Sequence, residues 1–255
     1  MNIKIFKSDG TKNNFILIVD NDNHNLIKKN IVRICRQFQT DGLIIISDHE
    51  KYDYKMDYYN NDASWETMCA NGARCAGLLM YKLNRCGKKI NFISGDGTHF
   101  LTVNDKLLSL SIRQPIFKSK EINILNYIGR YVDSGAKHFA IITENLNAKN
   151  IKKIGREIRQ HKFFEPDGVN VNFMEILNQN HIYVTTYEKG IENTVMSCGT
   201  GSVACAYYAH HKNLIKSPIK ISVPGGKLQL IFNKDWSEVW LSGPAKISEP
   251  IIIEI

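Results

Sequence analysis

The feature that most constrains the fold of this chain is a short motif that occurs twice. One copy reads Met68-Cys-Ala-Asn-Gly-Ala-Arg-Cys-Ala76 and the other reads Ser197-Cys-Gly-Thr-Gly-Ser-Val-Ala-Cys205. Each copy places a cysteine, a small residue, Asn or Thr, and then glycine ahead of a helical pattern. An internal repeat of this kind indicates two similar structural halves.

The segments that follow the two motifs also correspond. The first motif leads into a helical pattern over 76–83, an apolar segment at 90–93 and a Ser-Gly-Asp-Gly turn at 94–97. The second leads into a helical pattern over 204–210, an alternating segment at 219–223 and Pro-Gly-Gly at 224–226. Such segments and turns predict strands. We therefore predict two similar α/β halves that join near Pro115, after a strand at 107–112.

A cysteine directly before a helix has a distinctive electrostatic environment. The helix N-terminus offers backbone N–H groups and partial positive charge. Both favour an anion such as a substrate carboxylate, and the same field raises the thiolate fraction of a nearby thiol. A single unit is weak evidence, because many buried cysteines begin helices.

Two such units together indicate a specific reaction. If Cys69 and Cys198 face each other across a cleft, one thiol lies on each face of a substrate α-carbon whose carboxylate is held between the helix ends. One thiolate then removes the α-proton, and the opposite thiol returns a proton to the other face. Helix amides stabilise the charge that develops. The sequence therefore predicts an amino-acid racemase or epimerase that requires no cofactor.

The composition excludes several other classes of protein. Hydrophobic residues make up 43% and charged residues 23% of the 255 residues, as in ordinary globular proteins. No apolar run approaches the ~20 residues of a membrane-spanning helix, and the N-terminal segment has no apolar signal core. We expect a cytoplasmic protein with no membrane association. The net charge is +8, but the lysines are scattered, so we expect no nucleic-acid partner.

Six cysteines are present and none forms a Cys-x-x-Cys pair, so we predict no metal site. In a cytoplasmic protein all six are expected to be reduced. The simplest interpretation of a lone cysteine is a buried small apolar residue, and it fits Cys35, Cys86 and Cys205. Cys75 faces another side of its helix from Cys69 and is also expected in the core.

The chain resembles the diaminopimelate epimerase family along its whole length. Its cysteine motifs are similar to the family's C-G-N-G-x-R and A-C-G-T-G, whereas proline racemases share only the general cysteine pair. The other matching segments are Asn13-Asn14-Phe15, Asp41-Gly-Leu-Ile44, Tyr59-Asn-Asn-Asp62, Gly168-Val-Asn-Val-Asn-Phe173, Tyr187-Glu-Lys-Gly190, Pro224-Gly-Gly226 and Ser242-Gly-Pro-Ala245.

The resemblance implies a fold and a function. It implies an α/β (α+β) fold of two pseudo-symmetric halves, each a mixed, mostly antiparallel sheet or barrel around a central helix, with the active site in the cleft between them. We expect the halves at 1–114 and 115–248, with a strand at 249–255 returning to the first. The implied activity is conversion of LL-2,6-diaminopimelate to meso-diaminopimelate, for lysine and peptidoglycan precursor biosynthesis, by a homodimer.

The resemblance also implies roles for individual residues. Cys69 and Cys198 would be the acid and the base, and His138 and Glu188 would tune their pKa values. Ala70-Asn71 and Gly199-Thr200 would bind the α-carboxylate and amine from the two helix ends. The other residues expected to line the substrate pocket are Asn13, Asn60, Asn170, Glu188 and Lys189.

Structural alternatives exist for several of these residues. Asparagines in turns, such as Asn13 and Asn60, more often cap the local backbone than bind a ligand. His138 lies in an apolar stretch and could be a structural histidine, and Arg74 could form a structural ion pair.

The chain departs from the family pattern in four places. Ala70 replaces the first glycine of the first motif, at little cost if φ is negative. The glycine-rich segment that precedes Asp41 in the family is shortened here to residues 37–40. Ala136 replaces an asparagine and Lys189 an arginine that help hold the far end of diaminopimelate, and lysine cannot reproduce a bidentate grip. Lys137 is a candidate replacement cation.

Three hypotheses follow. The first is diaminopimelate epimerase. The second is a racemase of another amino acid on the same scaffold, motivated by Ala136 and Lys189. The third is a non-enzymatic binding module whose basic surface contacts an acidic partner; the intact cysteine pair argues against it.

Overall fold

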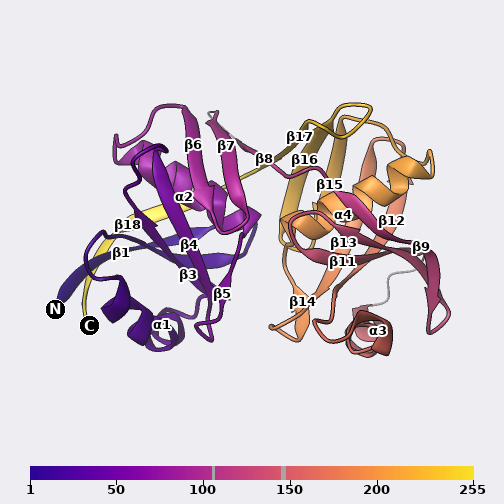
Figure 1. The fold of residues 1–255 in the computed structure, drawn as a ribbon, viewed down its shortest axis with the longest axis horizontal. Helices are drawn as coiled ribbons and strands as arrows, with labels where there is room; N and C mark the ends of the chain where they lie inside the picture. Colours follow the sequence, from indigo (N-terminus) through magenta and orange to yellow (C-terminus); the bar gives the residue numbers. More distant parts are fainter. Residues whose placement is uncertain (105–106, 145–147) are drawn as a thin grey trace. The chain divides into compact units, whose positions relative to one another are not determined.

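The computed structural model describes residues 1–104, 107–144 and 148–255. The chain has a mixed α+β fold that divides into two compact units (Figure 1). Unit 1 comprises residues 1–111 and 242–255, and unit 2 comprises residues 112–241.

Unit 1 consists of two helices and the strands that pack on them. In chain order its elements are β1 (Asn2–Asp9), β2 (Asn14–Val19), α1 (His24–Phe38), β3 (Gly42–Ser47), β4 (Tyr54–Asn60), β5 (Trp65–Glu66), α2 (Ala70–Lys82), β6 (Lys89–Ser94), β7 (Gly97–Val103), β8 (Leu108–Ser111) and β18 (Lys246–Glu254). Strands β2 and β3 are parallel, as are β4 and β6, and β18 returns to pair antiparallel with β1.

Unit 2 repeats this order of elements, apart from one additional strand at its start and a short helix after its outer helix. It contains β9 (Ile116–Ile124), β10 (Tyr127–Asp133), β11 (Lys137–Ile142), α3 (Ala148–Arg159), the short helix η1 (Lys162–Phe164), β12 (Asn170–Asn178), β13 (His181–Glu188), β14 (Asn193–Val195), α4 (Gly199–His211), β15 (Ile219–Val223), β16 (Gly226–Phe232) and most of β17 (Val239–Gly243). Its parallel pairs are β11 with β12 and β13 with β15. Because helices and parallel pairs occupy matching places in both units, the repeated motif reflects a repeated fold.

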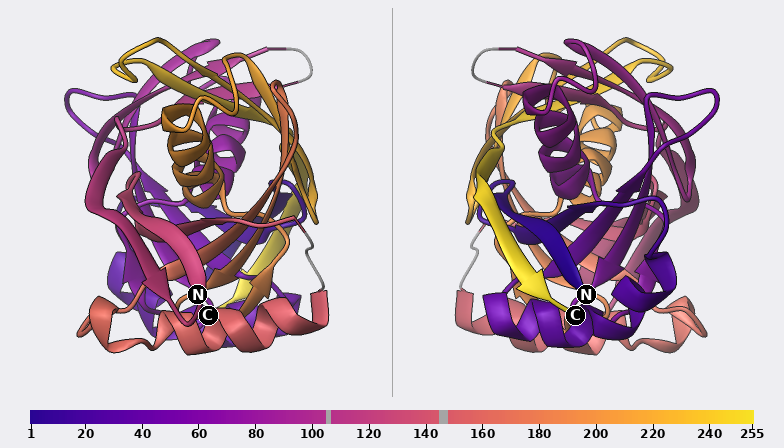
Figure 2. Two further views of the ribbon diagram at one scale, coloured as in Figure 1. Left: turned by 90° about the vertical axis from the view of Figure 1, so that its right-hand side faces the viewer. Right: turned by 90° about the vertical axis from the view of Figure 1, so that its left-hand side faces the viewer.

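The central helices α2 and α4 are nearly buried around their whole circumference (Figure 2). Both are rich in alanine and glycine, and a helix that is apolar and small on every side can be enclosed by strands. At Gly77, for example, a Cβ would lie 2.8 Å from Leu101 Cδ2 of β7. Small residues therefore let the surrounding strands approach each central helix closely.

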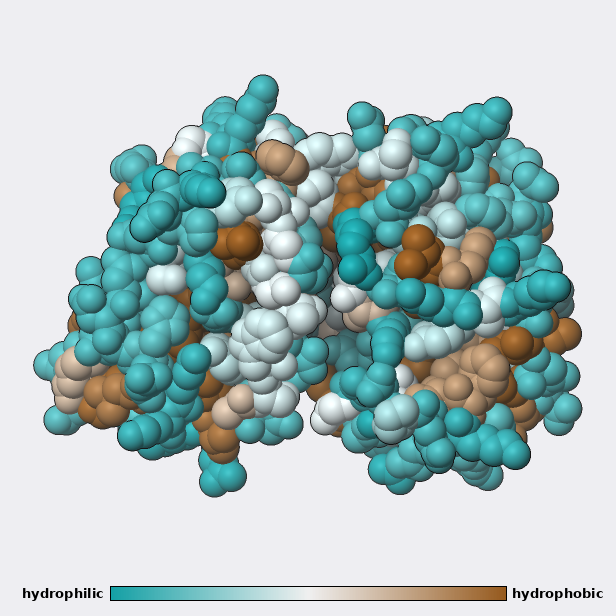
Figure 3. All heavy atoms as spheres, viewed as in Figure 1, coloured by the Kyte–Doolittle hydropathy of each residue, from teal (hydrophilic) through white to brown (hydrophobic). Residues whose placement is uncertain are grey.

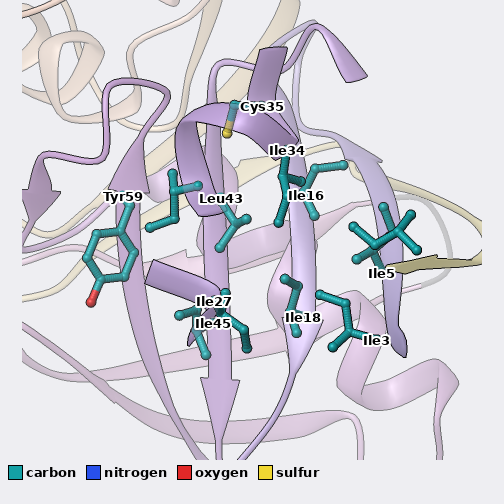
Figure 4. Packing of buried hydrophobic residues seen from close by; sticks show 12 residues of the cluster. Ile3, Ile5, Ile16, Ile18, Ile27, Ile34, Cys35, Leu43, Ile45 and Tyr59 are labelled. Carbon is teal, nitrogen blue, oxygen red and sulfur yellow. The ribbon is translucent and has the colours of Figure 1, made fainter. Parts of the chain in front are cut away.

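The outer helix α1 is amphipathic and covers the other face of its sheet. Its buried residues recur with helical spacing at Ile27, Ile31, Ile34 and Cys35. They pack against isoleucines of β1, β2 and β3, as Figure 4 shows. In unit 2, α3 contributes Ile151 and Ile158 to a corresponding core with Phe139, Val171 and Tyr187. The strands of each unit are thus covered by an outer helix on one face and by a central helix on the other.

The visible surface of each unit is mainly hydrophilic, with smaller hydrophobic areas between the polar ones (Figure 3). Among the described residues, no helix is both long enough and apolar enough to cross a membrane.

Candidate active site

The first cysteine of the repeated motif begins the central helix of unit 1. Cys69 is the N-cap of α2, with φ −133° and ψ 111°, and its carbonyl oxygen accepts a 2.8 Å hydrogen bond from the Ala73 N–H. The amides of a first helical turn have no partner within the helix, and the helix dipole adds positive potential there. This end of α2 therefore favours an anion, whether a carboxylate or the Cys69 thiolate.

Asn13 and Asn71 lie beside the Cys69 sulfur. Asn13 Nδ2 donates to Asp41 Oδ2 at 2.7 Å, which leaves Asn13 Oδ1 facing the cysteine motif. That oxygen accepts from Asn71 Nδ2 at 3.2 Å and lies 4.0 Å from Cys69 Sγ. The structure thus brings three of the predicted site residues of unit 1 together. Ala70 also has helical backbone as the first residue of α2, where alanine replaces glycine without strain.

Arg74, within the first motif, is fully buried among neutral partners. Its guanidinium donates to Asn71 Oδ1 at 2.8 Å, Thr11 Oγ1 at 3.0 Å and the Ala70 carbonyl at 3.2 Å. No carboxylate of the described residues forms an ion pair with it, so the expectation of a structural ion pair is wrong. Instead, a buried positive charge lies one helical turn from Cys69 and orients the Asn71 amide.

The second cysteine has the same local structure in unit 2. Cys198 is the N-cap of α4, with φ −126° and ψ 111°, and its carbonyl oxygen accepts from both the N–H and the hydroxyl of Ser202, at 3.0 and 2.8 Å. Cys198 Sγ lies 3.7 Å from Thr200 Oγ1. The two cysteines therefore occupy equivalent helix N-termini, one in each unit.

His138 is fully buried behind Thr200 and has a partner for each ring nitrogen. Nε2 lies 3.0 Å from Thr200 Oγ1, and Nδ1 lies 3.0 Å from Asn172 Nδ2. Burial lowers the pKa of His138 to about 3, so the imidazole is neutral at physiological pH. His138 is therefore a satisfied buried histidine that also contacts the residue next but one to Cys198.

The predicted pocket asparagines in the two units have local hydrogen bonds. Asn60 Oδ1 accepts from the Tyr58 hydroxyl at 2.7 Å and Asn60 Nδ2 donates to Ser64 Oγ at 3.0 Å, which ties it to the turn after β4. Asn170 Oδ1 accepts from the Lys189 backbone N–H at 2.9 Å. Asn170 thereby fixes the end of β13, where Glu188 is partly exposed and Lys189 is exposed.

Ala136 and Lys137, which the sequence relates to binding of the far end of the substrate, also lie in unit 2. Ala136 is in the turn between β10 and β11, after Gly135 at a φ of 105°. Lys137 forms an ion pair with Asp167 at 2.5 Å, which raises the pKa of the lysine and lowers that of the carboxyl. The cation suggested as a substitute for the missing side chains therefore already has a carboxylate partner.

The remaining cysteines differ from the two at helix N-termini. Cys35, Cys75 and Cys205 are buried, and burial raises the pKa of each thiol, to about 12 for Cys75. Cys86 is only partly buried, because it lies in the turn after α2. Its assignment to the core is therefore wrong. Among the described residues no cluster of His, Cys, Asp and Glu has the geometry of a metal site.

Comparison with known proteins decides the family. The family model described as Diaminopimelate epimerase matches residues 5–109 and 130–247. The chain belongs to the diaminopimelate epimerase family. A diaminopimelate epimerase of Flavobacterium psychrophilum is 35% identical over 96% of this chain and 97% of its own length. One from Aquifex aeolicus is 32% identical over 94% of each chain. Family membership makes the chain an epimerase, which removes the hypothesis of a non-enzymatic binding module.

Solved structures of low sequence identity share the fold. A Bacillus anthracis phenazine biosynthesis protein of the PhzF family superposes with a TM-score of 0.76 at 12% identity and covers both chains fully. A hydroxyproline epimerase from Agrobacterium vitis gives a TM-score of 0.71 at 12% identity, over 99% of this chain and 92% of that one. At this identity the likeness concerns architecture alone.

Sequence reasoning missed one residue of the Cys198 environment, Asn172. The hint was present in the segment Gly168–Phe173, because alternate residues of a strand point to the same face and Asn170 had already been assigned to the site. Asn172 is fully buried and bonds to His138 and to Thr186.

Proposed function

We propose that this epimerase converts LL-2,6-diaminopimelate to meso-diaminopimelate through two cysteines, Cys69 and Cys198. The observation that carries the proposal is the equivalent placement of the two thiols, each the N-cap of the central helix of its own unit. A single activated cysteine could serve many reactions. Two in a duplicated fold of this family fit proton removal on one face of a carbon and proton delivery on the other.

The proposed reaction begins with one sulfur as thiolate and the other as thiol. The thiolate takes the α-proton and becomes a thiol, while the electron pair left on the α-carbon is delocalised into the carboxylate. The opposite thiol then delivers its proton to the other face and becomes the thiolate. No atom is gained or lost, and the configuration inverts.

The residues around each cysteine have supporting roles in this proposal. The first-turn amides of α2 and α4, at Ala70-Asn71 and Gly199-Thr200, hold the α-carboxylate and stabilise the developing charge. Asn13 contributes to the site beside Cys69, and His138 and Glu188 adjust the pKa values of the two thiols. Asn60, Asn170 and Lys189 are assigned to substrate binding, and the two asparagines are held by the local hydrogen bonds described above.

Exchange of the α-proton in D₂O tests both the reaction and the substrate. Incubation of the enzyme with LL-diaminopimelate in D₂O should give deuterium at the α-carbon together with the meso product. Proton NMR measures the deuterium, and chiral chromatography measures the product. A panel of other L-amino acids is run in parallel. Exchange of diaminopimelate alone supports the proposal, and no exchange with any amino acid rejects it.

A second candidate is a racemase of a different amino acid. Ala136 lacks the amide, and Lys189 the guanidinium, that the family uses at the far end of its substrate, whereas the two cysteine motifs retain the family pattern apart from Ala70. Faster exchange of another amino acid in the same panel would favour this candidate.

The wider assignments follow from the proposed reaction. Meso-diaminopimelate is a precursor of lysine and of peptidoglycan, so we place the enzyme in that biosynthesis, in the cytoplasm. We also propose a homodimer, which sedimentation velocity at micromolar concentration tests directly.

A further inference from the structure

A chain of four buried or partly buried side chains leads to the Cys198 sulfur within unit 2. Thr186 Oγ1 donates to Asn172 Oδ1 at 2.8 Å, and Asn172 Nδ2 lies 3.0 Å from His138 Nδ1. His138 Nε2 lies 3.0 Å from Thr200 Oγ1, which is 3.7 Å from Cys198 Sγ. In such a series of hydrogen bonds, a group that accepts from one neighbour is left to donate to the next. Fixing the donor at one end therefore fixes the donor in every later bond.

The orientation of the Asn172 amide is fixed by a backbone group. Its Nδ2 also donates to the Asn170 carbonyl at 3.3 Å, and a carbonyl oxygen can only accept. The nitrogen end of the amide therefore faces Asn170 and His138, and the oxygen end faces Thr186. His138 Nδ1 must then be the acceptor of the bond from Asn172.

The direction of the remaining bonds follows from the charge of His138. Burial keeps the imidazole neutral by lowering its pKa, so it carries one N–H. Because Nδ1 accepts, that N–H is on Nε2 and donates to Thr200 Oγ1. Thr200 has a single hydroxyl hydrogen, which is left to donate toward Cys198 Sγ. A donor at this distance stabilises the thiolate form of Cys198.

The contact between Cys69 and Asn13 has the opposite direction. Asn13 Nδ2 donates to the Asp41 carboxylate at 2.7 Å, so Asn13 Oδ1 is the end that lies 4.0 Å from Cys69 Sγ. An oxygen acceptor next to sulfur favours the S–H form. The two cysteines therefore share a helix position but face side chains of opposite hydrogen-bonding character.

We infer that Asn172 is a positioning residue that fixes the His138 tautomer and, through Thr200, makes Cys198 the resting thiolate while Cys69 rests as a thiol. This inference rests on the proposed two-thiol mechanism, and it adds which cysteine is the base in the resting enzyme. The free enzyme is ready for the substrate configuration whose α-proton faces Cys198, and it must exchange a proton before it can use the other configuration.

The charged residues of the strands packed against α4 are Arg130 and Asp133 in β10, Lys137 in β11, Glu175 in β12 and Glu188 in β13. Asp133 at the end of β10 accepts from Arg113 at 2.5 Å and lies 3.9 Å from Lys118, and Glu188 is at the end of β13. The carboxylates would disfavour a thiolate, and the two cations have other partners, because Arg130 lies over the Phe117 ring and Lys137 pairs with Asp167. None of these groups replaces the donor that Thr200 supplies.

The test measures the titration of each cysteine separately. The intact enzyme is treated with iodoacetamide in brief pulses between pH 5 and pH 10, and alkylation of Cys69 and Cys198 is quantified by peptide mass spectrometry. We expect the midpoint of Cys198 to be the lower of the two. In Asn172→Ala it should rise by about one pH unit, a tenfold loss of thiolate equivalent to about 1.4 kcal/mol, while that of Cys69 stays unchanged.

Ser202→Ala is the matched control. It removes another buried polar group beside Cys198, but one whose hydroxyl donates to the Cys198 carbonyl oxygen. It should leave both midpoints in place even if it lowers the melting temperature. An equal effect of the two variants, or a midpoint for Cys69 below that of Cys198 in the native enzyme, would overturn the inference.

A second measurement requires no variant. In protein labelled with ¹⁵N-histidine, long-range ¹H–¹⁵N spectra distinguish the two neutral tautomers, and we expect His138 to carry its proton on Nε2. A proton on Nδ1 would refute the inference even if the enzyme racemises normally. Conversely, the expected His138 tautomer and thiol midpoints without any α-proton exchange would reject the proposed function and leave the assignment of the hydrogen bonds intact.

Discussion

Gly201 provides a test of how closely unit 2 is packed around Cys198. An alanine Cβ at this position would lie 2.2 Å from Asn172 Oδ1 and 3.2 Å from Cys198 Sγ. Replacing glycine by alanine inside a helix ordinarily stabilises by about 1 kcal/mol, whereas overpacking a buried site costs about 1–3 kcal/mol. We therefore expect Gly201→Ala to fold, with a free energy of unfolding lowered by roughly 0–2 kcal/mol.

The effect of Gly201→Ala on activity should exceed its effect on stability. The new methyl group forces the Asn172 amide away from its position, which breaks its bonds to Thr186 and His138. Loss of one or two hydrogen bonds at about 1 kcal/mol each corresponds to a decrease of about fivefold to thirtyfold in kcat/KM. Deuterium exchange at the α-carbon gives the rate, and thermal unfolding followed by circular dichroism gives the stability.

Gly72 occupies the equivalent position in α2 and is the matched control. There the Cβ would meet Ile44 Cδ1 at 2.5 Å, the far end of a flexible side chain, and would remain 3.7 Å from Cys69 Sγ. Because Ile44 can change rotamer, Gly72→Ala should keep activity within about threefold, since volume changes that a side chain can absorb cost little. If Gly201→Ala is fully active, or if the two variants lose activity equally, the packing argument is wrong.

Further predictions concern the thiols, pH and the substrate pocket. Cys69→Ser and Cys198→Ser should each lose about 10²–10⁴-fold in the rate of epimerisation while remaining folded, because serine is a poor base. The control Cys205→Ser should stay active. A folded active-site variant with a near-normal rate would contradict the mechanism. Because burial lowers the His138 pKa from 6.5 to about 3, its contribution to stability is complete above pH 6.5 and is lost as the pH falls toward 3. His138→Gln should flatten that decline in urea unfolding, and an unchanged slope would show that other groups cause it. Lys189→Arg should keep or improve diaminopimelate turnover by restoring a bidentate donor, by about 1–2 kcal/mol at most; abolished turnover in a folded variant would favour a different substrate.

The repeated cysteine motif was the most informative part of the sequence. Each motif predicts a helix that begins just after its cysteine, and Cys69 and Cys198 are indeed the N-caps of α2 and α4. The strands predicted at 90–93 and 219–223 lie within β6 and coincide with β15. These features are local: a turn residue, an apolar alternation and a helix start depend on neighbours within a few positions.

Side-chain partners were not predictable in the same way. Arg74 could equally have met a carboxylate, and only the fold shows that it bonds to Thr11 and Asn71. The partner of Lys137 is Asp167, which no local pattern indicates. Cys86 resembles the core cysteines in sequence but lies in a partly exposed turn.

The sequence by itself determined the duplication, the two helix N-termini that carry cysteines and the family to which the chain belongs, because motif spacing and hydrophobic periodicity act over short stretches of chain. The tertiary structure alone decided the surroundings of each sulfur. His138 meets Asn172 because β11 and β12 are parallel, with His138 aligned to Asn170, and it meets Thr200 because α4 packs on these strands. Strand register and helix packing are set by the whole core, so residues 62 positions apart in the chain come to share a hydrogen bond.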